Sequence, residues 1–433
     1  MMKRTVTAGI IGLAALISVS TASMVAAAAA PGTDGDLQRR ARRLLREVPL
    51  IDGHNDTPWQ YRKRVSLRIN DLDFGADLSE LEPPMHTDLA RLREGGVGAQ
   101  FWSVFIPIPQ RGGRPGDART VIEQIDFVKR LVDRYPDDLE LALTADDIER
   151  IHRAGRIASL IGMEGGHSIE DSLAVLRATY ELGARYMTIA HVKNTRWADS
   201  ATDDAEFDGL ADFGREVIRE MNRLGMIVDL SHVSPATMHD TLDITAAPVI
   251  FSHSSAFAVC RHVRNVPDDV LRRVRTNGGV VMITFLGYYV SEDLRTWDVR
   301  RRAERDAIAG GQDTPAVNRL MADWERANPK PRATIAQVAD HIDHVRALIG
   351  VDHIGLGGDY DGTSSLPEGM QDVSTYPALI VELLRRGYSD DDVRKIIGLN
   401  VLRVMRDVET TAATPQASTE PSEALFIEAD ASD

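Results

Sequence analysis

Cysteine is almost absent from this chain. Its 433 residues include a single cysteine, Cys260, so no disulfide can form within the chain. With 43% hydrophobic residues, a chain of this length can bury a large core, as one large α/β domain or as two smaller ones. The fold must therefore be held by its core, which suits a large barrel better than a small domain stapled by disulfides.

Positive charge is also scarce. The chain has 50 Lys and Arg residues against 65 Asp and Glu residues, which gives a formal net charge of −15 at pH 7. Nucleic acids and anionic membrane surfaces both bind proteins through clustered Lys and Arg side chains. The charge balance therefore argues against either partner.

The two ends of the chain differ in hydrophobicity. The C-terminal end has no hydrophobic tail, so we expect no lipid-anchor signal there. Residues 1–30 carry Lys3 and Arg4, then an apolar stretch of small residues, then an Ala-rich end with an A-x-A cleavage pattern. We expect a cleaved export signal, a linker and helix start over residues 31–44, and a periplasmic or extracellular location. The alternative is an uncleaved membrane anchor, because residues 8–30 are long enough to span a bilayer.

Apolar runs typical of buried strands recur eight times along the chain. Helical patterns separate most of them, and several of these patterns end in the glycine common at a helix C-terminus. Alternating strands and helices predict a parallel sheet, and eight such units predict a closed (β/α)8 barrel, or TIM barrel. The runs are "VPLIDGH" at 48–54, "VGAQFWSVF" at 97–105, "IASLIGME" at 157–164, "RYMTIAH" at 185–191, "MIVDLSH" at 226–232, "PVIFSH" at 248–253, "GVVMITF" at 279–285 and "HIGLGGD" at 353–359.

The barrel domain is expected over residues 45–407, with two closing helices at 376–386 and 390–407. Residues 291–332 are highly charged and interrupt the last crossover between strands, so we expect a mostly helical insertion over the barrel mouth or flank. The tail at 408–433 contains six acids and no Lys or Arg among small polar residues, and we expect it to be disordered.

Six of the eight runs end in a side chain that can bind a metal or move a proton. In a barrel, the carboxyl ends of the strands meet at one mouth, where the catalytic groups of this fold lie. Any one of these residues alone is as well explained as a core histidine or a capping acid. Together they predict a ring of functional side chains at the mouth: His54 with Asp56, Glu164, His191, His232, His253 and Asp359.

A ring of histidines and carboxylates needs a compensating cation, because each unpaired buried charge costs several kcal/mol. Such ligands without thiolates suit Zn²⁺ or a similar divalent ion in a hydrolytic site. The ring is rich for one ion, whereas two ions about 3.5–4 Å apart can share a carboxylate and activate one water. Glu164 is the candidate bridge, since Gly165 and Gly166 leave room for substrate or backbone to approach.

The remaining histidines are interpreted as structural or surface residues. His167 stands close to Glu164, and we interpret it as a hydrogen-bonding residue that orders a loop. His341 and His344 share a helix face with two aspartates, and a solvated helix face explains them better than an ion site. The others lie in helical segments, in polar loops or at the wrong end of a strand: His152, His239, His86, His262 and His353.

The site residues lie in stretches that resemble the membrane dipeptidase (renal dipeptidase) family of zinc peptidases. These stretches occur in order over about residues 45–407, so the series is far more specific than a single motif. The family fold is a (β/α)8 barrel with two zinc ions, and the resemblance implies two Zn²⁺ per chain. The matching stretches are "IDGHNDTPW", "GAQFWSVF", "SLIGMEGGHSI", "MTIAHVKNTRWAD", "DLSHVS", "PVIFSHSSA", "RNVPDD" and "GLGGDYDG".

The resemblance implies a role for each residue of the metal site. His54 and Asp56 match the ligands of one zinc. His232 and His253 match the ligands of the other zinc, and Glu164 matches the carboxylate that bridges both.

Four further positions match residues that act on the substrate. His191 matches the histidine that stabilises the tetrahedral intermediate, and Asp359 matches the acid that shuttles the proton. Arg264 matches the arginine that pairs with the terminal carboxylate of the substrate, and Tyr289 aligns with a substrate-contacting tyrosine. The implied activity is hydrolysis of dipeptides with a free C-terminal carboxylate by a metal-activated water.

This chain also departs from parts of the family. Animal members are tethered by a lipid and linked by disulfides, and this chain offers neither, which implies an exported bacterial enzyme. Family members are often dimers, so a homodimer is one expectation.

Two rival interpretations stay open. The first is a related metal-dependent amidohydrolase that acts on a β-lactam, a lactone or an N-acyl amino acid. Such enzymes commonly show His-x-His after the first strand, where this chain has His54-x-Asp56. The second is a non-catalytic exported protein that binds dipeptides or metal.

Overall fold

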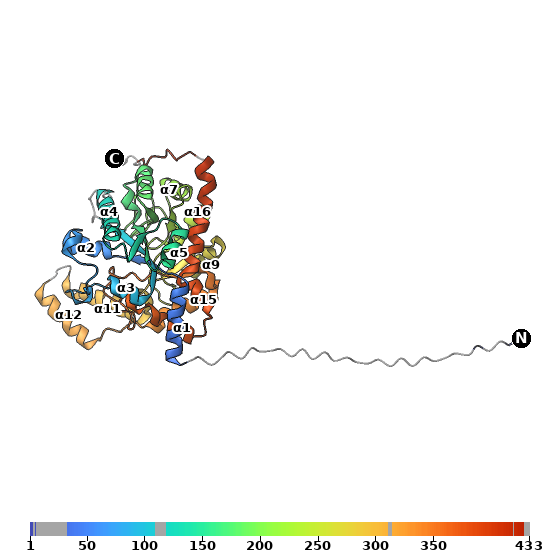
Figure 1. Ribbon diagram of the computed structural model, residues 1–433. Helices are drawn as coiled ribbons and strands as arrows, with labels where there is room; N and C mark the ends of the chain where they lie inside the picture. The colour runs from blue at the N-terminus through green and yellow to red at the C-terminus, as the bar shows by residue number, and fades with distance from the viewer. Residues whose placement is uncertain (3–4, 6–32, 109–117, 311–313, 419, 428–433) are drawn as a thin grey trace.

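A computed structural model of the chain describes residues 1–2, 5, 33–108, 118–310, 314–418 and 420–427. Apart from residues 1, 2 and 5, the predicted export signal lies outside the described residues. Within the described part of the chain, no helix has the length and hydrophobicity needed to cross a membrane. Strands occupy the centre of the molecule and helices surround them (Figure 1).

Eight parallel strands close into a barrel, which confirms the predicted fold. Each strand pairs with the next around the ring, and β9 returns to pair with β1. The strands are buried on both faces, as expected where helices cover the outside and side chains fill the inside. In ring order they are β1 (Leu50–Asn55), β2 (Val97–Phe105), β4 (Ile157–Glu164), β5 (Ala184–Thr188), β6 (Ile227–Asp229), β7 (Ile250–Phe251), β8 (Val280–Ile283) and β9 (Ile354–Leu356).

A ninth strand was not predicted. This strand, β3 (Leu139–Leu141), pairs in parallel with the start of β4, where Leu139 lies opposite Ile157. Only Leu139 of its three residues is buried, so it has no apolar run to reveal it. It lies beside the barrel rather than in the closed ring, because β4 pairs with β2 from Ala158 to Glu164 and with β5 from Ile161 to Met163.

Side-chain hydrogen bonds cap the first turn of several helices. In α13 (Ile335–Ile349), the Thr334 side chain accepts from the Gln337 amide and the Gln337 side chain accepts from the Thr334 amide. The other helices of the barrel layer are α1 (Asp34–Glu47), α2 (Thr57–Val65), α3 (Leu89–Gly95), α4 (Ala118–Arg134), α5 (Ala145–Arg153), α6 (Leu173–Glu181), α7 (Asp212–Leu224), α8 (Pro235–Ile244), α9 (Asp268–Asn277), α14 (Tyr376–Arg385), α15 (Asp390–Arg394) and α16 (Asn400–Ser418).

The charged segment between β8 and β9 is helical, as expected. It contains α11 (Glu292–Ala309) and α12 (Pro315–Ala327), preceded by the short α10 (Gly287–Val290). Trp297 packs against Trp324 with ring centroids 5.9 Å apart, which joins the two longer helices. Both lie at one end of the molecule (Figure 1).

The prediction of a disordered tail from residue 408 is wrong for its first part. Helix α16 continues to Ser418, and Val408 and Ala412 are buried in it. These two apolar residues lie four positions apart, so they face the core together. The acidic composition of the segment concealed this pattern. Farther on, Phe426 packs edge-on against Phe213 of α7, with centroids 5.6 Å apart.

Substituting Val408→Asp is expected to destabilise the protein by about 2–4 kcal/mol, because a carboxylate replaces a buried methyl pair. The matched control is Thr410→Asp on the exposed face of the same helix, which should change stability by less than about 0.5 kcal/mol. Denaturant unfolding measures both variants. Equal stability of the two variants would contradict the burial of Val408 in α16.

Candidate functional site

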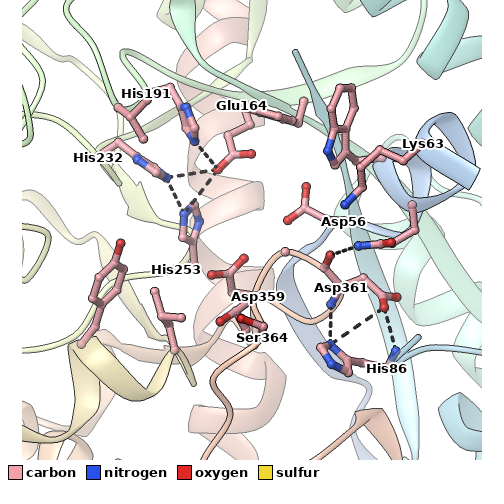
Figure 2. A pocket seen from close by; sticks show the side chains of 18 of the residues that line it. Asp56, Lys63, His86, Glu164, His191, His232, His253, Asp359, Asp361 and Ser364 are labelled. Carbon is pink, nitrogen blue, oxygen red and sulfur yellow. Dashed lines mark hydrogen bonds and ion pairs between the residues drawn. The ribbon is translucent and has the colours of Figure 1, made fainter. Parts of the chain in front are cut away.

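The seven residues predicted to ring the barrel mouth lie together at its C-terminal rim, and Figure 2 labels all of them except His54. They come from six strand ends. His54 lies in β1 with Asp56 just beyond it, and Glu164 is the last residue of β4. The other four follow their strands by two or three residues: His191 after β5, His232 after β6, His253 after β7 and Asp359 after β9.

The Glu164 carboxylate is the centre of this cluster. Its Oε1 atom lies 3.1 Å from Nε2 of His232 and 3.5 Å from Nε2 of His191. The same oxygen lies 3.5 Å from Nε2 of His54 and 3.6 Å from Nε2 of His253. Four imidazoles from four strand ends thus converge on one buried carboxylate oxygen.

Three overlapping groups in the cluster can each hold a metal ion. In each group, the ligand atoms all lie within 4.8 Å of one another. Glu164 and His54 each belong to two of the groups, so the carboxylate lies between separate ligand sets. The groups are His54 with Glu164 and His253, Glu164 with His191 and His232, and His54 with Asp56 and Asp359.

The His54 ring is oriented by a tyrosine below it. The Tyr186 hydroxyl donates to the carbonyl oxygen of Gly53 at 3.1 Å, so it accepts from Nδ1–H of His54, 2.9 Å away. This fixes the proton on Nδ1 and leaves a lone pair on Nε2. Among the described residues, this buried Nε2 has no hydrogen-bond partner. It therefore points into the cluster as a free ligand atom.

The His253 ring is oriented by a serine and a buried aspartate. The Ser252 hydroxyl donates to Asp229 Oδ2 at 2.6 Å and accepts from Nδ1–H of His253 at 2.9 Å. Asp229 also accepts from the Thr188 hydroxyl at 2.5 Å and from the amides of Ser252 and Ser231. Sequence reasoning missed Asp229, although it is the aspartate of the quoted motif "DLSHVS".

Burial sets the charge states of the cluster. It lowers the pKa of His232 and His253 well below the ordinary histidine value, and nearby Arg264 lowers both further. Burial alone would raise the pKa of Glu164, but the imidazoles of His54 and His191 outweigh it and hold that pKa well below its usual value. The cluster thus presents two neutral imidazoles beside an ionised carboxylate, which is a suitable donor set for a divalent cation.

The backbone beside the cluster is strained where the side chains must converge. His232 and Asp359 adopt φ values of 71° and 58°, in the left-handed region that residues with a side chain rarely occupy. Gly362 makes room for two carboxylates, since a Cβ there would lie 2.2 Å from Asp56 Oδ2 and 2.4 Å from Asp359 Oδ1. The loop after β9 is therefore shaped to bring Asp359 beside Asp56.

A cavity of about 620 Å³ opens above the cluster. Arg264 and Tyr289 both line it, and the guanidinium lies 5.4 Å from the centroid of the tyrosine ring. Arg264 is only 1% exposed, and it donates weakly to Ser254 Oγ at 3.3 Å and to the His253 carbonyl at 3.4 Å. Its buried Nε–H has no acceptor among the described residues.

Two histidines outside the cluster have definite structural roles. Nε2 of His167 lies 2.9 Å from the carbonyl oxygen of Ile106 and orders a loop, as predicted. The interpretation of His341 as part of a solvated helix face is wrong, because this residue is fully buried. Its Nδ1 accepts from the Ala256 amide and its Nε2–H donates to the Val290 carbonyl, each at 3.0 Å.

His341 therefore supports the substrate side of the cavity. The two backbone groups that it holds belong to the segments that carry Arg264 and Tyr289. Burial lowers the pKa of His341 to about 4, so the ring is neutral near pH 7 and can accept at Nδ1. In the sequence, His341 has the same polar surroundings as His344 on the same helix, and only the packing of α13 distinguishes the two.

The fold, the site and a sequence match over most of the chain together identify the protein family. A parallel barrel with histidines and carboxylates around a cavity at its C-terminal rim is an architecture typical of metal-dependent hydrolases. Residues 38–419 match the family model of the membrane dipeptidases, peptidase family M19. The chain belongs to this family of metallo-dipeptidases.

Solved structures share the fold at low sequence identity. The "probable dipeptidase PvdM from Pseudomonas aeruginosa" is 22% identical with a TM-score of 0.73, over 87% of this chain and 100% of that one. A "metallo peptidase from Rhodobacter sphaeroides liganded with phosphinate mimic of dipeptide L-Ala-D-Ala" is 22% identical with a TM-score of 0.68, over 83% and 99%. A structure described as "dipeptidase AC, Metallo peptidase" is 23% identical with a TM-score of 0.67, over 83% and 98%.

Replacing His341 by leucine is expected to cost about 2–4 kcal/mol, since two buried backbone groups lose their partners. The control is His344→Leu on the same helix, where the half-buried imidazole pairs with the aspartate Asp268 near the surface. That change should cost less than about 1 kcal/mol. Thermal or denaturant unfolding of both variants compares them, and an equal cost would contradict the connecting role of His341.

Proposed function

We propose that this protein is a zinc-dependent dipeptidase with two zinc ions per chain, acting on dipeptides with a free C-terminal carboxylate. The observation that carries the proposal is the convergence of four imidazoles on Glu164 Oε1 at the barrel rim. A buried carboxylate that meets four imidazoles, two of them neutral nitrogen donors, is a good arrangement for two cations that share the carboxylate.

The donor set fits two divalent ions. His54 and Asp56 would hold one ion, His232 and His253 the other, and Glu164 would bridge both. The free lone pair of His54 Nε2 and the fixed ring of His253 support this assignment, because each ring presents Nε2 to the same space. When bound, two such ions lower the pKa of a water toward about 7 and polarise a carbonyl.

Arg264 would receive the terminal carboxylate of the dipeptide. A buried guanidinium with an unused Nε–H is shaped for bidentate binding of a carboxylate, and Tyr289 flanks it. Because Arg264 also donates to the carbonyl of His253, the carboxylate site is tied directly to a proposed metal ligand. This contact would set the distance from the carboxylate of the substrate to its scissile carbonyl.

His191 and Asp359 would act on the reacting atoms. His191 lies 3.5 Å from Glu164, where its ring can donate to the oxygen of the scissile carbonyl as negative charge develops. Asp359 would take the proton of the attacking water and deliver it to the leaving nitrogen. The carbon–nitrogen bond breaks, a carbon–oxygen bond forms, and two amino acids leave.

Metal content and activity should change together. We expect about two zinc ions per chain by elemental analysis, loss of dipeptide hydrolysis after chelation, and recovery when zinc is restored. A Glu164→Gln variant should retain less than half of the zinc, whereas Glu123→Gln on the surface of α4 should retain all of it. Full zinc occupancy without Glu164, or full activity without metal, would contradict the proposal.

Removal of the Arg264 charge should abolish recognition of the free carboxylate. The wild-type protein is expected to prefer a dipeptide over its C-amidated form, and Arg264→Met should lower kcat/KM for the free dipeptide about a hundredfold. Hydrolysis of the amidated form should change far less.

An N-blocked dipeptide separates this proposal from the amidohydrolase alternative. A dipeptidase should reject the blocked form, whereas an enzyme for N-acyl amino acids should prefer it. A wild-type preference for the amidated or the blocked form would refute the assignment.

A further inference from the structure

The cavity has a second charged wall, formed by Lys63 and Arg64 of α2 together with His86 of the loop before α3. We call these three residues the α2 wall. They are separate from the proposed metal ligands and from Arg264. Sequence reasoning treated His86 as a loop residue and did not consider Lys63 or Arg64, because the cavity alone brings the three together.

The two cations of the α2 wall have no acidic partner. Among the described residues, no carboxylate lies within ion-pair distance of Lys63 or Arg64, whereas Arg62 on the same helix pairs with Glu123 at 2.5 Å. Arg64 is held by neutral acceptors, the Gln60 side-chain oxygen at 3.2 Å and the Pro83 carbonyl at 2.7 Å. Its charge is thus positioned but not neutralised.

His86 adds a hydrogen-bond donor to this wall. Its Nδ1 accepts from the Asp361 amide at 2.9 Å, so the neutral ring carries its proton on Nε2. Burial lowers the pKa of His86, which favours this neutral form. Asp361 also borders the cavity, but its carboxylate is occupied by the Thr57 hydroxyl at 2.9 Å and the His86 amide at 2.7 Å. Apart from Asp56 and Asp359 of the cluster, this side of the cavity carries two cations, Lys63 and Arg64, against one acid, Asp361, so the wall is positive.

Arg264 and Lys63 of the α2 wall lie beside different members of the histidine and carboxylate cluster. Arg264 contacts the backbone of His253, whereas Lys63 extends toward the cavity on the side of Asp56 (Figure 2). A dipeptide with its carboxylate on Arg264 and its scissile carbonyl beside Glu164 therefore directs its N-terminal residue toward the α2 wall.

We propose that the α2 wall selects dipeptides whose N-terminal residue has an acidic side chain, aspartate or glutamate. This inference rests on the proposed dipeptidase function and names its substrate class. A side-chain carboxylate would bind Lys63 and Arg64 and accept from His86 Nε2–H, and so satisfy charges that the protein leaves unpaired. An N-terminal lysine or arginine side chain would be repelled by the same two cations.

The test compares Glu-Ala with Gln-Ala, which have nearly the same shape and differ in charge. The zinc-loaded protein should show a kcat/KM for Glu-Ala about tenfold above that for Gln-Ala at low salt, and the preference should shrink as salt screens the charges. Lys63→Met should reduce the ratio to about two, and Lys63→Glu should reverse it and favour Lys-Ala. The control Lys129→Met removes the same charge from α4, outside the cavity lining, and should leave the ratio unchanged.

The outcomes separate this inference from the proposed function. Equal cleavage of Glu-Ala and Gln-Ala, or a ratio that Lys63→Met does not alter, would overturn the role of the α2 wall and leave the dipeptidase assignment standing. No cleavage of any dipeptide by the zinc-loaded protein would overturn both.

Discussion

The organisation of this protein depends on one buried carboxylate. Glu164 ends a strand that lies between two neighbours in the closed barrel, and its side chain lies at the centre of the rim. Four imidazoles reach the same oxygen from four other elements. A negative charge in such a place is tolerable only because basic or cationic groups surround it, and this constraint explains the composition of the whole rim.

A second layer of residues supports this arrangement from below. Tyr186 and Ser252 each fix the proton of one imidazole, and Asp229 holds Ser252 through a carboxylate that is itself fully buried and satisfied. These contacts lie inside the barrel, where packing leaves little freedom to reorient. The rim is therefore preorganised by groups that never touch a substrate.

Much of this could be predicted from the sequence. Apolar runs separated by amphipathic segments predicted the eight strands of the barrel, and the functional side chains that end six of these runs predicted the rim, because parallel strands all end on the same side. Each of these signals is local in the sequence, and the barrel topology brings the residues at the strand ends together in space. The barrel topology therefore predicts the ring of His54, Glu164, His191, His232 and His253.

Other features depend on packing that no local pattern records. Strand β3 is too short to show a period, and the helix at Val408 was hidden by an acidic composition. His341 and His86 looked like surface histidines, since burial and cavity walls arise only when distant segments meet. Residues that shape substrate choice lie largely in this second class.

The central claim is that Glu164 joins two metal ions at the barrel rim. Anomalous diffraction at the zinc edge, from crystals grown with zinc, tests it most directly. The account predicts two peaks about 3.5–4 Å apart, one beside His54 and Asp56 and the other beside His232 and His253, with the Glu164 carboxylate between them. A single ion bound without Glu164, or no ion within bonding distance of that carboxylate, would contradict it.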